Sequence, residues 1–114
     1  MQEHNIYIYI YIYLLRTQIL STHYITMYNY LAEFAGTTLL VYVILATANP
    51  LAIGAVLALI MLILTKVSGG YVNPAVTITM AAAGKLPVSD IIPYVISQCV
   101  GGLVALQLYK RFTI

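Results

Sequence analysis

Three long apolar stretches dominate the chain from residue 31 to residue 109, and they limit what it can fold into. Each holds about 17–19 residues, and at 1.5 Å per residue such a helix just covers a hydrocarbon core about 30 Å thick. The stretches span about residues 31–48, 51–67 and 91–109. Turn formers such as Asn49 and Pro50 separate the first two. The pattern predicts three transmembrane helices.

The composition also indicates a membrane protein. Of the 114 residues, 62% are hydrophobic and only 7% are charged, and the mean hydropathy is +0.95. A soluble domain of this size needs far more polar surface. The net charge of +2 is too small to indicate a nucleic-acid partner. We therefore expect an all-α, multi-pass integral membrane protein that is surrounded by lipid, with one membrane domain.

The side chains that catalysis needs are sparse in the sequence. The single cysteine, Cys99, excludes an internal disulfide and has no metal-ligand spacing. His4 and His23 stand alone, far from any pair of carboxylates. Because we find no nucleophile–base set and no metal-binding pattern, we expect no enzyme, no metal and no cofactor.

The first residues are of low complexity. Residues 6–13 are a strict Ile-Tyr repeat, which alternating ATA and TAT codons would encode. The apolar run is too short to span a bilayer before Arg16, and the basic amino end of a signal peptide is missing. We predict that residues 1–26 are a dispensable leader, that Met27 is the working start, and that residues 27–114 form the membrane domain. The alternative is a genuine amphipathic or strand-prone leader.

The segment between the second and third stretches reads SGGYVNPAVT at residues 68–77. Pro74 suits the first turn of a helix, and Gly84 suits its end. This helix has about ten residues, which is too short to cross a membrane. We therefore expect a re-entrant half-helix. The irregular backbone before it can lie in a bilayer only where it is buried in protein or lines water.

A half-helix that ends near the bilayer centre places free N–H groups and a positive dipole end there. These donors cannot face lipid, so they must meet water or another polar partner. Asn73 adds a side-chain donor at the same point. The positive field discourages cations from passing. The residues alone therefore predict a pore for small neutral molecules.

Other residues predict local features of the helices. Ser89 and Asp90 are good N-terminal residues for the third long helix. Tyr94 and Tyr109 suit an interfacial aromatic belt. Small residues that let helix backbones approach closely are Gly36, Gly54, Gly101 and Gly102.

Three motifs, in order and at membrane-span spacing, resemble the major intrinsic proteins, which are the aquaporin and aquaglyceroporin channels. They are AEFAGTTLL, SGGYVNPAVT and YVISQCVGG, and the resemblance covers about residues 31–109. It implies one repeat of that fold, with three transmembrane helices plus one re-entrant half-helix. It also implies passive transport of water and of small neutral solutes such as glycerol.

The resemblance implies roles for the residues of the central loop. Asn73 would donate to the permeating molecule at the narrow centre, while Pro74 and Ala75 would seat the half-helix. Backbone carbonyl groups would line the pore as acceptors; they belong to Gly69, Gly70 and Tyr71.

The resemblance also implies supporting and constricting residues. Glu33 would accept hydrogen bonds from the descending loop, with help from Gln98, because a carboxylate inside a membrane needs a partner. Ile53 would contribute to the selectivity constriction, and Leu57 shares its helix face. Without the resemblance, Ile53 and Leu57 would be read as lipid or helix contacts.

Two departures from the family pattern affect these expectations. Tyr71 stands where the family usually has His, so the resemblance assigns no His to the mouth of the pore. The Asn-Pro-Ala motif occurs once rather than twice, so the arginine that follows the second motif is missing and Val76 takes the corresponding place.

A single repeat leaves one half-helix without a counterpart, and an inverted second copy could supply it. Two basic residues, Lys66 and Lys85, would face one side of the membrane, and Lys110 and Arg111 the other, so no strong orientation is dictated. We expect an antiparallel homo-oligomer with an apolar constriction that also passes glycerol. The alternatives are a separate second-half partner, a truncated non-conducting protein, or a modulator of a full-length channel.

A remote alternative is a small proton-coupled exporter with Glu33 as its proton and substrate site. That class has four full spans and a tryptophan in its binding chamber, whereas this chain has no Trp. Solute flux without a pH gradient separates a channel from an exporter.

Overall fold

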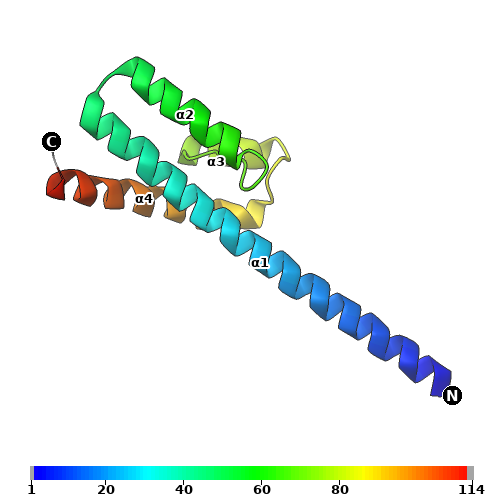
Figure 1. Cartoon of the computed structure of the whole chain (residues 1–114). Coiled ribbons are helices and arrows are strands. Elements are labelled where there is room, and N and C mark those ends of the chain that lie inside the picture. The colour runs from blue at the N-terminus through cyan, green and yellow to red at the C-terminus, as the bar shows by residue number, and fades with distance from the viewer. Residues whose placement is uncertain (1, 113–114) are drawn as a thin grey trace.

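A computed structural model describes residues 2–112, without the side chains of residue 2 and residues 21–25. Met1 and residues 113–114, which belong to the predicted leader and membrane domain, lie outside the described residues. The regular elements of residues 2–112 are all helical (Figure 1), so the all-α class is confirmed for this part of the chain. They are α1 (Gln2–Thr47), α2 (Pro50–Leu64), α3 (Pro74–Ala82), the 3-10 turn η1 (Val88–Asp90) and α4 (Ile91–Arg111).

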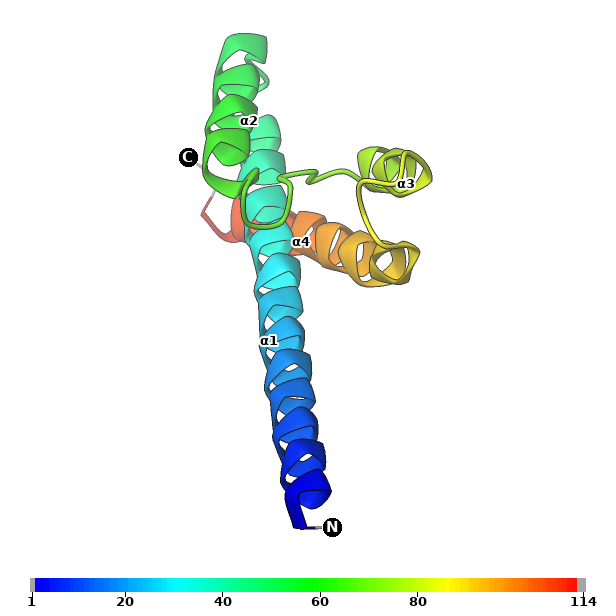
Figure 2. The same cartoon turned by 90° about the vertical axis from the view of Figure 1, so that its right-hand side faces the viewer.

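The longest helix, α1, has 46 residues and includes the Ile-Tyr repeat. Its first half extends away from the other helices (Figure 2), and its side chains from Ile6 to Leu20 are largely exposed. The repeat is therefore helical and not a strand, and it continues without a break into the first apolar segment. That residues 1–26 are dispensable stays a prediction.

Within the described part of the chain, two helical segments are long and apolar enough to cross a membrane, namely Thr26–Thr47 and Val88–Arg111. The second apolar helix, Pro50–Leu64, has 15 residues. At 1.5 Å per residue it is about 22 Å long, which is less than a 30 Å hydrocarbon core.

The turn between α1 and α2 forms where the sequence predicts a break. Ala48 has a positive φ of 51°, and Asn49 is the N-cap of α2 with Pro50 in its first turn. The Oδ1 atom of Asn49 accepts hydrogen bonds from the backbone N–H groups of Leu51 (2.9 Å) and Ala52 (3.4 Å). The cap reverses the chain so that α2 packs back along α1 (Figure 1).

Glycine lets α4 lie directly on α1. A Cβ atom on Gly101 would come within 2.7 Å of the backbone oxygen of Phe34, so no side chain fits there. A Cβ atom on Gly36 would lie 2.9 Å from the side chains of Leu64 and Val72, at the end of α2 and in the loop after it. Gly54, by contrast, has nothing within 4 Å. The expectation of close approach therefore holds for Gly36 and Gly101 and is wrong for Gly54 within one chain.

The start of α4 corrects two local expectations. Asp90 precedes the helix, but its side chain makes no cap hydrogen bond; its Oδ1 atom accepts instead from the Tyr30 hydroxyl at 2.8 Å. Tyr94 is not at an interface, because only 1% of it is exposed and it packs in a core cluster with Ala81 and Leu86. In both cases a tertiary contact to another element overrides the local signal.

Candidate functional site

The loop between α2 and α3 descends through a tight turn and then runs in an irregular conformation. The carbonyl oxygen of Leu64 accepts hydrogen bonds from the N–H groups of Ser68 and Gly69, both at 3.0 Å. Gly69 and Gly70 have φ angles of 100° and 64°, a region that glycine adopts readily. Val72 has a φ of 44°, which is costly for a β-branched residue and must be held by its surroundings.

A single carboxylate, that of Glu33 in α1, holds this loop. Its Oε1 atom accepts from the Ser68 hydroxyl and the Tyr71 N–H, each at 2.9 Å. Its Oε2 atom accepts from the Val72 N–H at 2.7 Å and from Gln98 Nε2 at 3.1 Å. Glu33 is completely buried. Burial of a carboxylate is costly unless its lone pairs are satisfied, and here the loop supplies the donors.

Gln98 in α4 links the carboxylate to the short helix α3. Its Nε2 atom also donates to the hydroxyl of Thr77 in α3 at 2.8 Å. The Thr77 hydroxyl donates in turn to the Asn73 carbonyl at 2.9 Å. Gln98 and Thr77 are both buried, and the Oε1 atom of Gln98 has no hydrogen-bond partner among the described residues. The network joins α1, α4, the loop and α3 into one unit.

The short helix α3 has nine residues, against the prediction of about ten, and is capped at both ends. The Oδ1 atom of Asn73 accepts from the Ala75 N–H at 2.8 Å, and Pro74 occupies the first turn. At the other end, the N–H groups of Gly84 and Lys85 bond to the carbonyls of Ala81 and Met80, and Gly84 has a φ of 76°. This is the glycine-based cap expected from the sequence.

The N-terminal tip of α3 retains free donors. The Oδ1 atom of Asn73 is used by the cap, Asn73 is exposed, and its Nδ2 group donates no hydrogen bond among the described residues. Pro74 has no N–H, and Thr77 N–H bonds to the Asn73 carbonyl. Among the described residues, the hydrogen bonds leave the N–H of Val76 without an acceptor. The tip therefore carries two unpaired donors at the positive end of the helix dipole.

The loop carries free acceptors beside that tip. The Ser68 carbonyl accepts a hydrogen bond of 2.7 Å from the Tyr94 hydroxyl. The hydrogen bonds among residues 2–112 include none to the carbonyls of the next three residues, which are Gly69, Gly70 and Tyr71. Only Val72 separates these carbonyls from Asn73, the N-cap of α3, along the chain.

Aromatic rings brace the loop from the side of α4. The ring of Tyr94 lies 6.0 Å from that of Tyr71 and 5.8 Å from that of Tyr30, the latter edge-to-face at 84°. The Tyr71 ring lies over Gly69, where a Cβ atom would come within 2.7 Å of it. Sequence reasoning missed the contribution of Tyr94, Thr77 and Ser68 to this site. The four-residue spacing of Asn73, Thr77 and Ala81, which places them on one helix face, could have pointed to Thr77.

The structure does not bring the predicted constriction residues together with this network. Ile53 and Leu57 are half-buried on α2, and Val76 is exposed on α3. The main packing of α2 is against α1, and that of α3 is against α4. Their shared role in a constriction stays a prediction.

Comparison with known proteins identifies a protein family that this chain matches. A family model described as major intrinsic protein matches residues 20–114. The chain is 38% identical over 95 residues to glycerol uptake facilitator protein-like 6 of Lactiplantibacillus plantarum, covering 75% of this chain and 44% of that protein. It is 43% identical over 89 residues to aquaporin Z of Photorhabdus laumondii, and the match covers 65% of this chain and 38% of that protein. It is 39% identical over 89 residues to aquaporin Z of Brucella melitensis, and this match covers 65% of this chain and 39% of that protein. The chain thus spans less than half the length of these relatives. No solved structure matches it significantly.

Proposed function

The chain belongs to the major intrinsic protein family, and from this premise we propose that it forms a membrane channel for water and small neutral solutes such as glycerol. The observation that carries the proposal is the capped half-helix α3. Its tip keeps two unpaired donors, from Asn73 and Val76, although the helix is anchored by the buried Glu33 carboxylate. The family consists of integral membrane channels and not of enzymes, and the names of the relatives refer to water and glycerol transport.

The chemistry of the loop suits a neutral, hydrogen-bonding solute. In this proposal the free carbonyls of Gly69, Gly70 and Tyr71 accept from the solute, and Asn73 then donates to it at the tip of α3. Because donors and acceptors are fixed by the Glu33 network, they replace the hydration of the solute without rearranging. The positive end of α3 disfavours cations.

We propose that α1, α2 and α4 cross the membrane and that α3 re-enters it. Residues 26–47 and 88–111 are long enough to span. In this arrangement α2 is completed by the turn residues that follow Leu64. Two findings support a re-entrant α3, namely its nine-residue length and the burial of the preceding loop against Glu33.

A passage between two half-helices requires a second Asn-Pro-Ala segment, and the 114 residues contain one. We propose that an inverted copy of the chain supplies the other. Lys66 and Lys85 follow α2 and α3 on one side, and Lys110 and Arg111 end α4 on the other. This balance permits both orientations. The alternatives are a separate second-half protein that completes the pore, and a full-length channel that this chain modulates.

The geometry argues against the exporter alternative. Glu33 accepts four hydrogen bonds from the protein and is completely buried, so no face of its carboxylate is open to a substrate.

Flux into proteoliposomes tests the proposal. Vesicles that contain the chain, without a pH gradient, should show faster osmotic shrinkage and faster glycerol entry than empty vesicles. Water flux without glycerol flux would refute the wide, apolar constriction of Ile53 and Val76. Crosslinking in bilayers, with tags on both chain ends, should report both orientations if the inverted pair forms.

A further inference from the structure

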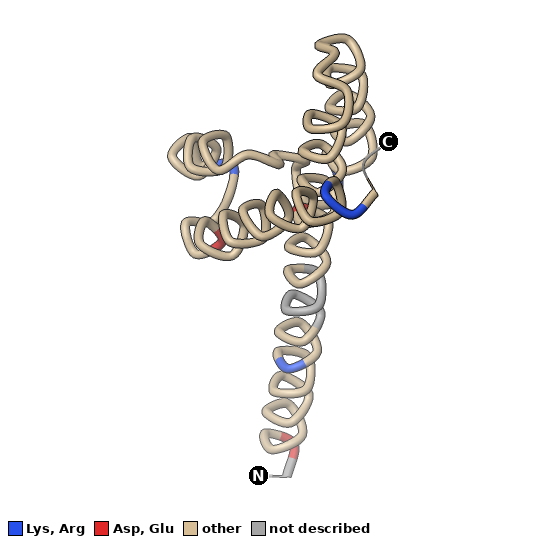
Figure 3. Tube along the Cα trace, turned by 90° about the vertical axis from the view of Figure 1, so that its left-hand side faces the viewer, with Lys and Arg blue, Asp and Glu red and all other residues tan. Residues whose placement is uncertain are grey.

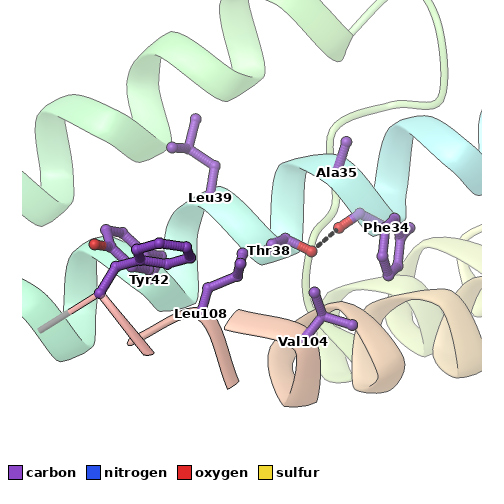
Figure 4. Close-up of a pocket in the computed structure, with 8 residues that line it drawn as sticks. Phe34, Ala35, Thr38, Leu39, Tyr42, Val104 and Leu108 are labelled. Atoms are coloured by element: carbon purple, nitrogen blue, oxygen red, sulfur yellow. Dashed lines mark hydrogen bonds between the residues drawn. The ribbon is translucent and has the colours of Figure 1, made fainter. Parts of the chain in front are cut away.

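An apolar groove runs between α1 and α4 (Figure 4), and none of the residues that line it belongs to the loop that carries Asn73. Its volume is about 590 Å³. The groove is lined from α1 by Phe34, Ala35, Thr38 and Tyr42, and from α4 by Val104 and Leu108. Phe34 and Tyr42 are eight residues apart, so the groove follows about 12 Å of helix. Both walls belong to the segments that are long enough to cross a membrane.

The interior of the groove offers almost nothing to a polar ligand. The hydroxyl of Thr38 donates to the Phe34 carbonyl at 2.7 Å and lies 3.1 Å from the Gly101 carbonyl, so its single proton is used within the protein. The remaining lining residues are hydrocarbon or aromatic, with the phenol of Tyr42 near one end (Figure 4). A ligand along this groove must therefore be apolar over most of its length.

The end of the groove near Tyr42 and Leu108 is basic. Lys110 and Arg111 form the last turn of α4, directly beyond Leu108 and beside the lining residue Phe112. Both residues are exposed, and this basic turn lies near the carboxyl end of the chain (Figure 3).

The side-chain carboxylates of the sequence cannot neutralise this turn. There are three of them, Glu3, Glu33 and Asp90. Glu33 is buried against the loop. Asp90 stands at the opposite end of α4, about 30 Å away for a helix of 21 residues. Glu3 lies in the first turn of α1, at the far end of the molecule (Figure 3).

We propose that this groove binds one acyl chain of an anionic phospholipid, whose phosphate meets Lys110 and Arg111. An apolar groove that ends at two cations and a phenol matches a lipid that has a hydrocarbon tail and an anionic headgroup. The same end of α1 and α4 is the boundary of the spanning segments, which is where a headgroup lies.

The charges favour this lipid over a second copy of the chain. A copy that covered the groove would need carboxylates to face the basic turn. Its Glu33 is buried, its Asp90 already accepts a hydrogen bond from Tyr30, and its exposed Glu3 lies in the first turn of α1, in the half of that helix that extends away from the other helices. An anionic lipid supplies the charge directly.

Native mass spectrometry of the purified full chain tests the proposal, with phosphatidylglycerol and phosphatidylcholine of identical acyl chains as probes. We expect phosphatidylglycerol to bind more tightly. The double variant Lys110→Gln/Arg111→Gln should reduce this preference roughly 30-fold. The control Lys66→Gln/Lys85→Gln removes the same charge outside the groove and should leave the preference unchanged.

Filling the groove gives an independent readout. Ala35 is exposed and lines the groove, so Ala35→Phe should lower binding of both lipids, and Ala35→Leu, a smaller filler, provides the same test if the first variant folds poorly. The proposal is overturned if neither lipid is preferred, if both double variants lose the preference equally, or if the filled groove binds lipid normally. It is also overturned if filling the groove dissociates a dimer while lipid binding is unchanged, because the groove would then be an interface between copies.

Discussion

The carboxylate of Glu33 accepts a hydrogen bond of 2.7 Å from the backbone N–H of Val72. Val72 has a positive φ of 44° and directly precedes Asn73, the N-cap of α3. The bond helps to hold a strained residue at the point where α3 begins. The position of the tip of α3 thus depends on a side chain of α1.

Replacement of Glu33 tests this anchor. In Glu33→Gln the amide keeps one acceptor oxygen but turns an NH2 group toward backbone N–H groups, so buried donors lose their acceptors. We expect a loss of about 2–4 kcal/mol in the free energy of unfolding, measured by thermal unfolding in detergent micelles. Glu3→Gln, at an exposed position of α1, should change it by less than about 0.5 kcal/mol. Equal effects of the two variants would contradict the anchor.

Two threonines of α3 form a matched pair. The Thr77 hydroxyl is buried and bridges Gln98 and the Asn73 carbonyl. The Thr79 hydroxyl also bonds to a carbonyl four residues back, that of Ala75, but is exposed. Thr77→Val should therefore cost about 1–3 kcal/mol of unfolding free energy, whereas Thr79→Val should be close to neutral. If both substitutions prove neutral, the network does not hold α3.

Two helical glycines should respond in opposite directions to alanine. In Gly101→Ala the new methyl group would meet the Phe34 backbone oxygen at 2.7 Å, so α1 and α4 must separate. We expect a loss of about 1–3 kcal/mol. Gly54 has nothing within 4 Å, so Gly54→Ala should stabilise α2 by up to about 1 kcal/mol through helix propensity. Unfolding curves of the two variants provide the measurement, and a shift in the same direction would contradict the packing.

Two tyrosines of the aromatic cluster differ in their hydroxyl groups. Tyr94 donates to the Ser68 carbonyl from a buried position, while the Tyr71 hydroxyl has no hydrogen-bond partner in the described part of the chain. Tyr94→Phe should cost about 1–2 kcal/mol in unfolding free energy, and Tyr71→Phe less than about 0.5 kcal/mol. A larger loss for Tyr71→Phe would show that its hydroxyl is engaged within the protein.

The limits of α3 could be predicted because they are set by local chemistry. Asn73 and Pro74 begin a helix, and Gly84 ends one, whatever surrounds them. The turn at Asn49 and Pro50 was predictable for the same reason. Family resemblance directed attention to Glu33 and Gln98, which the structure places in hydrogen-bond contact with each other.

The roles of Thr77, Ser68 and Tyr94 could not be predicted from nearby residues. Each bonds to a residue at least 21 positions away in the sequence, and such pairings arise only when the helices pack. Asp90 failed as a predicted cap for this reason, because the Tyr30 hydroxyl, 60 positions away, uses its carboxylate. The continuation of α1 through the Ile-Tyr repeat was also unexpected, since alternating β-branched residues usually indicate a strand.

The most direct test of the channel compares two asparagines that cap helices in the same way. Asn49 and Asn73 both precede a proline and cap through Oδ1, and Asp is an equally good cap. Asn73→Asp removes the proposed solute donor, so stopped-flow glycerol and water flux in proteoliposomes should fall roughly 5- to 30-fold for a lost interaction of about 1–2 kcal/mol. Asn49→Asp, with the same change of charge at the turn between α1 and α2, should conduct like the unmodified chain. Equal flux through both variants, or no flux above empty vesicles for the unmodified chain, would contradict the account.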